Sequence, residues 1–183
     1  NKPASIGEIR TGPFGFLSVL ETRLGLSGIS VHPVHRIDEY MKRMKAIDID
    51  SAWFHNSFTA DPWSTARQLL SWRDQLFEAG WQGNANTDGT ARLKALAELE
   101  MVNIPLSPGR PERLREVIKQ LEQGAKVGIA KIEIVEPLDL LPPVWRNLME
   151  LLQAQGISIE QLPGPTTSKV KGNLAATQRV LWG

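Results

Sequence analysis

Residues 128–162 read GIAKIEIVEPLDLLPPVWRNLMELLQAQGISIEQL, in which two short apolar runs flank a helical pattern. The first run, 129–135, stops at Glu136-Pro137, because a proline cannot donate to a strand ladder. Apolar residues at helical spacing follow from Pro143 to Gly156, and the second run spans 157–162. Strand, helix and strand in this order predict a right-handed βαβ unit with parallel strands.

The composition is that of an ordinary globular domain. The chain has 183 residues, of which 42% are hydrophobic and 22% charged, with a formal net charge of +1. Such a charge gives no global attraction to nucleic acid or to anionic membranes. The absence of cysteine excludes a disulfide framework and a thiolate zinc site. No apolar run approaches the roughly 20 residues that span a bilayer, so we expect a cytoplasmic protein without membrane contact.

Other segments repeat apolar residues every three or four positions, which is typical of amphipathic helices. We predict helices over residues 16–24, 34–46, 62–79, 91–101, 112–123 and about 166–181. Arg73 falls inside the apolar stripe of its helix, so we interpret it as one partner of a structural ion pair. The chain begins at Asn1 and ends within a helical pattern at Gly183, and we therefore expect a piece of a longer protein.

Two further runs, 6–11 and 51–58, are predicted as strands. Four strands separated by helices predict one α/β domain over residues 1–183, with three layers and helices on both faces of a mostly parallel sheet. This outline is that of a P-loop nucleotide hydrolase, with a helical insertion at about 90–124. Ligands of such sheets lie beyond the carboxyl ends of the strands, so the loops after these runs are the candidate sites.

The loop after the first predicted strand reads GPFGFLSV over residues 12–19. A phosphate-binding loop needs glycines, a lysine that reaches the phosphates and a hydroxyl that holds magnesium. Gly12 and Gly15 are present, but Ser18 occupies the lysine position and Val19 the hydroxyl position. We interpret the loop as a degenerate phosphate loop that lacks the groups for ATP and magnesium, while an ordinary glycine-containing turn explains the same residues.

The loop after the third predicted strand offers one acid. Glu136 occupies the position of a magnesium-binding carboxylate, and Pro137 replaces the second acid that an ATPase uses. A solvated strand-end carboxylate is the alternative reading of Glu136. His32 and His35 lack the further ligands of a metal site. We therefore predict no catalytic residue and no metal.

Two groups of side chains suggest contacts with other molecules. Lys169, Lys171 and Arg179 lie beyond the last predicted strand, where phosphate-backbone contact with DNA or simple solvation explains them. Tryptophans surround the second predicted strand and the helix after it. They are Trp53, Trp63, Trp72 and Trp81. Trp63 and Trp81 lie at the predicted helix ends, where they are suited to base stacking, while a core or an interface with another protein explains such residues equally well.

Three segments together resemble a known family: GPFGFLSVLETRLGL (12–26), FTADPWSTARQLLSWRDQL continuing to AGW (58–81), and EPLDLLPPVW (136–145). They resemble the amino-terminal region of bacterial AddB-like PD-(D/E)XK nuclease proteins. Those are DNA-repair and recombination proteins built on a superfamily 1 helicase scaffold. The resemblance implies a leading helicase-like domain, with the nuclease near the far end of the parent chain.

The resemblance implies a function that the residues alone do not specify. We expect a non-catalytic helicase-like scaffold that docks against other domains of the same chain or a partner helicase and contacts single-stranded DNA. The sequence departs from related proteins with an intact phosphate loop at residues 17–19 and at Pro137. Two alternatives stay open: a nucleotide- or phosphate-binding α/β enzyme with its site at the Gly12–Ser18 turn, and a protein-interaction module that uses its tryptophans.

Overall fold

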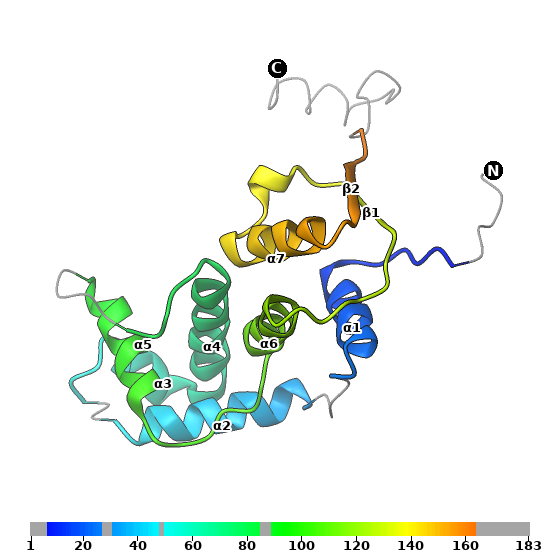
Figure 1. Cartoon of the computed structure of the whole chain (residues 1–183). Helices are drawn as coiled ribbons and strands as arrows, with labels where there is room; N and C mark the ends of the chain where they lie inside the picture. The colour runs from blue at the N-terminus through cyan, green and yellow to red at the C-terminus, as the bar shows by residue number, and fades with distance from the viewer. Residues whose placement is uncertain (1–6, 27–30, 48–49, 85–88, 164–183) are drawn as a thin grey trace, which may run out of the picture.

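A computed structural model describes residues 7–26, 31–47, 50–84 and 89–163. Seven α-helices, a short 3₁₀ turn and two strands follow one another within these ranges (Figure 1). In chain order they are α1 (Pro13–Arg23), α2 (Pro33–Lys45), α3 (His55–Ala60), α4 (Pro62–Glu78), α5 (Ala91–Met101), α6 (Arg110–Glu122), β1 (Lys131–Ile134), the 3₁₀ turn (Leu138–Leu140), α7 (Pro143–Ala154) and β2 (Ser158–Gln161).

The predicted strand-helix-strand unit is confirmed as parallel. β1 and β2 are hydrogen-bonded neighbours, with Lys131 in register with Ser158 and Ile134 with Gln161. The ladder is extended by main-chain bonds from Ser158 to Ala130 at 3.1 Å and from Leu162 to Ile134 at 2.7 Å. α7 is the connection between the strands, and its first turn begins at the predicted proline.

The predicted three-layer, P-loop-like fold with a mostly parallel sheet is wrong. Within the described residues the sheet has only these two strands, and helices dominate. The reason lies in the strand sequences, in which isoleucine alternates with charged or polar residues. The isoleucines face the helices. On the other face, Lys131 bridges Glu133 at 3.0 Å and Glu160 at 2.7 Å. Strands of a sheet covered on both faces are apolar on both faces. A charged outer face instead belongs to a sheet covered on one side.

The two other predicted strands are also wrong where the structure describes them. Residues 51–54 form turns, and α3 then places Phe58 one helical turn after Phe54, so that both rings lie in the core with centroids 6.4 Å apart. The four-residue spacing of Phe54 and Phe58 is therefore that of a helix and not that of a strand. Residues 8–11 are exposed and form no strand, and Ile9 remains 62% exposed.

The helix predictions hold for the described part of the chain. α1, α2, α4, α5 and α6 begin and end within a few residues of the predicted bounds. Asp61 caps α4 as its sequence context predicts, because its carboxylate accepts a hydrogen bond from the Ser64 N–H at 3.0 Å. The helix predicted over 166–181 lies outside the described residues.

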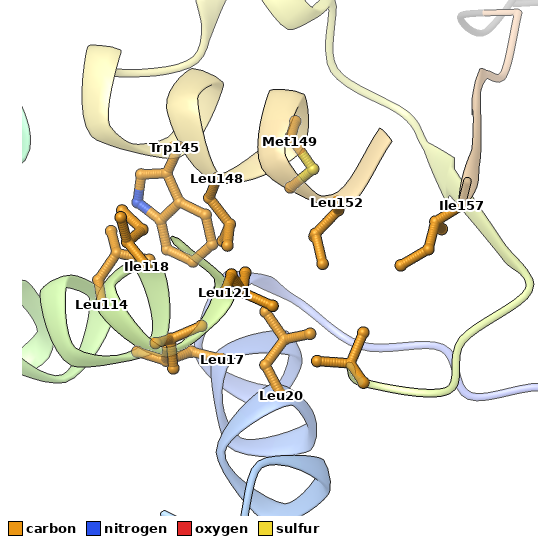
Figure 2. Close-up of a cluster of buried hydrophobic side chains, with 12 residues drawn as sticks. Leu17, Leu20, Leu114, Ile118, Leu121, Trp145, Leu148, Met149, Leu152 and Ile157 are labelled. Carbon is orange, nitrogen blue, oxygen red and sulfur yellow. The ribbon is translucent and has the colours of Figure 1, made fainter. Parts of the chain in front are cut away.

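The described residues form two apolar clusters rather than one. The first joins α1, α6, α7 and the sheet, and Figure 2 shows α7 packed over α1 and α6. Its buried members are Leu17, Leu20, Leu114, Val117, Ile118, Leu121, Val127, Trp145, Leu148, Met149, Leu152 and Ile157. The second joins helices α2 to α5. Its buried members are Ile37, Tyr40, Met44, Phe54, Phe58, Ala66, Leu69, Leu70, Ala95, Leu96 and Leu99.

Candidate functional site

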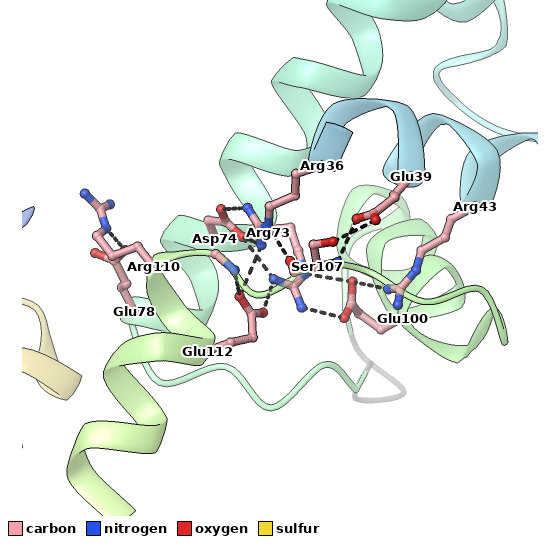
Figure 3. A network of polar contacts seen from close by, with 11 residues as sticks. Arg36, Glu39, Arg43, Arg73, Asp74, Glu78, Glu100, Ser107, Arg110 and Glu112 are labelled. Carbon is pink, nitrogen blue, oxygen red and sulfur yellow. Dashed lines mark hydrogen bonds and ion pairs between the residues drawn. The ribbon is translucent and has the colours of Figure 1, made fainter. Parts of the chain in front are cut away.

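A buried set of charges lies where α2, α4, α5 and α6 meet, beside both apolar clusters. Figure 3 shows three guanidinium groups converging with carboxylates from different helices. We call this set the central ion-pair network; its members are Arg36, Arg43, Arg73, Asp74, Glu100 and Glu112. α6 packs its apolar side into the first cluster and α4 into the second, so the network ties the two clusters together.

Arg73 is the centre of the network and only 5% exposed. Its Nε and Nη2 atoms donate to the two carboxylate oxygens of Glu100, each at 2.9 Å. Nη1 donates to Glu112 at 2.5 Å and to Asp74 at 3.0 Å. The expected structural ion pair is thus confirmed. The fork geometry of a guanidinium explains why arginine can satisfy several carboxylates at once.

Arg36 extends the network from α2 to α6. It binds both oxygens of Asp74, with Nη2–Oδ1 at 2.9 Å, and it contacts Glu112 at 3.2 Å. Its Nε donates to the main-chain carbonyl of Ser107 at 2.9 Å. Glu112 also accepts the Gly109 N–H at 2.7 Å and so closes the first turn of α6. The start of α6 is therefore fixed against α2 and α4 by charged hydrogen bonds.

The loop between α5 and α6 is held by the same part of α2. Glu39 accepts hydrogen bonds from the main-chain N–H and the hydroxyl of Ser107, both at 2.7 Å. Arg43 donates to the Ile104 carbonyl at 2.7 Å. Side chains of α2 thus provide hydrogen-bond partners for main-chain groups of this partly buried loop.

Burial and charge act in opposite directions on the ionisable groups of the network. Burial alone would lower the pKa of Arg73, but the hydrogen bonds that Arg73 donates to Glu100 and the charge of Glu112 raise this pKa above its ordinary value. Burial likewise opposes the ionisation of Glu112, yet Arg73 and Arg36 lower its pKa below the ordinary value. The phenol of Tyr40 is buried beside Glu100, and burial raises its pKa. Its hydroxyl has no hydrogen-bond partner among the described residues.

Two ion pairs flank the network and also join different helices. Arg110 of α6 binds Glu78 of α4, and Arg113 of α6 binds Glu21 of α1 with Nε–Oε1 at 2.7 Å. The Arg113–Glu21 pair raises the pKa of Arg113. These pairs border an open groove of about 990 Å³ between α1, α2, α4 and α6. Arg36, Arg110 and Arg113 of this groove are bound to carboxylates, whereas Arg67, which also lines the groove, is exposed and forms no salt bridge with another described residue.

The predicted phosphate turn lies at the start of α1, with Gly12 as its N-cap. Ser18 points its hydroxyl to the Phe14 carbonyl at 3.1 Å and accepts a hydrogen bond from Arg113 at 3.3 Å. At Gly15 a Cβ atom would lie 1.8 Å from the Thr11 hydroxyl oxygen, so the glycine allows close contact within this turn. No described strand precedes the turn, which is therefore not placed at the edge of a parallel sheet.

Arg113 is the cation that sequence reasoning missed beside Ser18. It comes from α6, 95 positions further along the chain, and only the packing of α6 on α1 brings it there. The Glu21 carboxylate, on the buried side of α1, already binds this guanidinium. No local motif around residues 12–19 could have predicted it.

The other predicted site residues are not brought to this turn. Glu136 is exposed two residues beyond β1, and no hydrogen bond or ion pair among the described residues joins it to Gly12, Gly15 or Ser18. Lys169, Lys171 and Arg179 lie outside the described residues. His32 caps α2, with its Nδ1 accepting the Val34 N–H at 3.3 Å. The described part of the chain holds no cluster of three metal-ligating side chains.

Comparisons of the chain with protein-family models, curated proteins and solved structures find no match. None of the helices in the described ranges combines the length and apolar character needed to cross a membrane.

Proposed function

We propose that this chain is a non-catalytic scaffold domain of a bacterial DNA-repair helicase-nuclease of the AddB-like kind. In this role it docks against other domains of the same chain or a partner helicase and contacts single-stranded DNA. The observation that carries the proposal is the closed central ion-pair network. Its charges form ion pairs that hold helices from the two apolar clusters together, which is a structural role.

The chemistry of the buried charges supports a scaffold rather than an enzyme. Catalytic acids, bases and nucleophiles need access to a substrate and pKa values suited to proton transfer. Arg73 instead binds three carboxylates of its own chain, and its partner Glu112 is held in the ionised form. The nearest cation to the Gly12–Ser18 turn, Arg113, is engaged by Glu21.

The three resembling segments contribute to the interior of the described structure. Residues 12–26 contain α1, and residues 136–145 contain the 3₁₀ turn and the first residues of α7. Residues 58–81 contain the end of α3 and all of α4, and they supply Arg73 and Asp74 to the network. Each segment thus has a structural role that fits a domain retained for its shape.

Exposed apolar side chains fit the docking part of the proposal. Met101 is 84% exposed at the end of α5, and Leu140 and Val135 are 75% and 62% exposed in the connection after β1. Large apolar side chains of this kind are often covered when a protein meets a partner surface. They lie near both apolar clusters, so partner contacts on more than one side are expected.

The proposal is tested by titrating the chain with a labelled ATP analogue in the presence of magnesium, and by assaying ATP turnover. We expect no turnover and no micromolar binding, because Arg113, the cation that binds Ser18, is already engaged by Glu21. Micromolar binding with hydrolysis would reject the non-catalytic role. Binding of single-stranded DNA that weakens as salt rises would support the DNA contact, since phosphate contacts release counterions.

A further inference from the structure

Two tryptophans and an arginine from three parts of the chain form one partly exposed cluster. Trp53 lies in the turn before α3, Trp72 on α4 and Arg92 in the first turn of α5. α5 lies at the end of the molecule away from the two-stranded sheet (Figure 1). The two indole rings are stacked, with centroids 6.0 Å apart and planes inclined by 18°.

The position of Trp53 is fixed by a buried neighbour. The Trp53 and Phe54 rings pack edge to face, with centroids 5.6 Å apart and planes at 87°, and Phe54 is buried in the second apolar cluster. Trp53 nevertheless keeps 38% of its surface exposed. The indole is therefore held in one orientation while part of it stays open to a ligand, which lowers the entropy cost of binding.

Arg92 lies over both rings, with its guanidinium carbon 5.2 Å from the Trp53 centroid and 6.0 Å from the Trp72 centroid. Arg73 and Arg110 also lie over aromatic rings, but each of these binds carboxylates, and Arg115 lies over the single ring of Phe77 rather than over two indoles. Arg92 has no carboxylate partner within the described ranges. Its positive charge is therefore not neutralised by any described carboxylate.

We propose that Trp53, Trp72 and Arg92 form a stacking site for a base of single-stranded DNA, an inference that rests on the proposed DNA contact and gives it a location. Unpaired bases present flat π faces that stack on aromatic side chains, and an arginine beside them adds cation–π and phosphate contacts. A duplex keeps its bases stacked on one another and offers no free face. A proline-rich peptide also packs on indoles, but it brings no negative charge to Arg92.

The test measures binding of a fluorescein-labelled oligothymidylate to the 183-residue chain by anisotropy, over a series of salt concentrations. Trp53→Ala should weaken binding about fivefold or more, since one base–aromatic stack contributes about 1–3 kcal/mol. Arg92→Gln should reduce the slope of log affinity against log salt by about 0.7, the value for one phosphate contact on a single strand.

The chain contains a matched control for Trp53. Trp63 is 37% exposed, almost the same as Trp53, but it has no ring or guanidinium partner among the described residues. Trp63→Ala should leave oligothymidylate binding unchanged. Circular dichroism of each variant checks folding, and the exposed Arg92 provides a second test if Trp53→Ala does not fold.

The outcomes test the proposed stacking site and the proposed DNA contact separately. If the unmodified chain binds oligothymidylate while Trp53→Ala and Arg92→Gln bind as tightly, the stacking site is wrong and the DNA contact survives. If the unmodified chain binds no single strand, both fail, whereas the ATP titration still tests the non-catalytic role. The stacking site would also be overturned if duplex DNA bound as tightly as the single strand. It would be overturned as well if the chain bound a proline-rich peptide through Trp53 but did not bind oligothymidylate.

Discussion

Replacing Gly109 with alanine should destabilise the chain through Arg36. A Cβ atom at Gly109 would lie 2.2 Å from Cζ of Arg36 and 2.5 Å from each of its terminal nitrogens. The guanidinium cannot simply move aside, because the Ser107 carbonyl, Asp74 and Glu112 hold it. The added methyl group must therefore break some of these bonds or shift α6.

The magnitude follows from two contributions. Overpacking of a well-packed site costs about 1–3 kcal/mol. Gly109 is also the N-cap of α6, and alanine is a poorer N-cap than glycine by about 0.5–1 kcal/mol. We expect Gly109→Ala to lower the free energy of unfolding by about 3 kcal/mol. Urea unfolding followed by tryptophan fluorescence measures this loss from the midpoint at constant m-value.

Gly12 is the matched control for Gly109. It is the N-cap of α1, both glycines have negative φ and extended ψ, and a Cβ atom at Gly12 meets no described atom within 4 Å. Gly12→Ala should therefore show only the capping loss. Equal losses for Gly12→Ala and Gly109→Ala, within about 0.5 kcal/mol, would refute the reasoning. In an Arg36→Met background, Gly109→Ala should cost no more than Gly12→Ala.

Three other predictions concern the network. Arg73→Met should cost about 3–5 kcal/mol, because it leaves buried carboxylates unpaired, whereas Arg146→Met on the exposed side of α7 should stay within about 0.5 kcal/mol by urea unfolding. The lowered pKa of Glu112 adds stability that is fully present above its unfolded pKa of about 4.3 and is lost as pH falls through the folded value. Urea midpoints measured from neutral to acid pH should therefore fall less steeply for Glu112→Gln than for the unmodified chain. Tyr40→Phe should raise the melting temperature or leave it unchanged, since the buried hydroxyl lacks a described partner, and a clear loss would indicate a hidden hydrogen bond.

The helices could be predicted from sequence because their signals are local. Apolar spacing and the Asp61-Pro62 start place α4 within a residue or two of its observed bounds. The sheet was overestimated because the sequences KIEI and SIEQ were treated as strands of a large parallel sheet. Their alternation of isoleucine with charged or polar residues indicates one covered face, which the structure shows.

The candidate site was predicted only in part. A charge within an apolar stripe correctly identified Arg73 as paired, since an unpaired buried guanidinium is too costly. Its partners Glu100 and Glu112 lie 27 and 39 positions away, and no local spacing connects them. The glycines at 12 and 15 were interpreted as a remnant of phosphate binding, but the described turn follows no strand. Tertiary packing determines both the partners of Arg73 and the surroundings of the glycine turn, and the periodicity of the sequence carries no information about such packing.

A double-mutant cycle between Arg73→Met and Glu112→Gln is the most direct test of the claim that buried charges hold the two apolar clusters as one unit. Arg73 lies on a helix of the second cluster and Glu112 on a helix of the first, and they meet at 2.5 Å. We expect a coupling energy of at least about 1.5 kcal/mol in urea unfolding, as for close buried charge pairs. Losses that add within about 0.5 kcal/mol would contradict the claim.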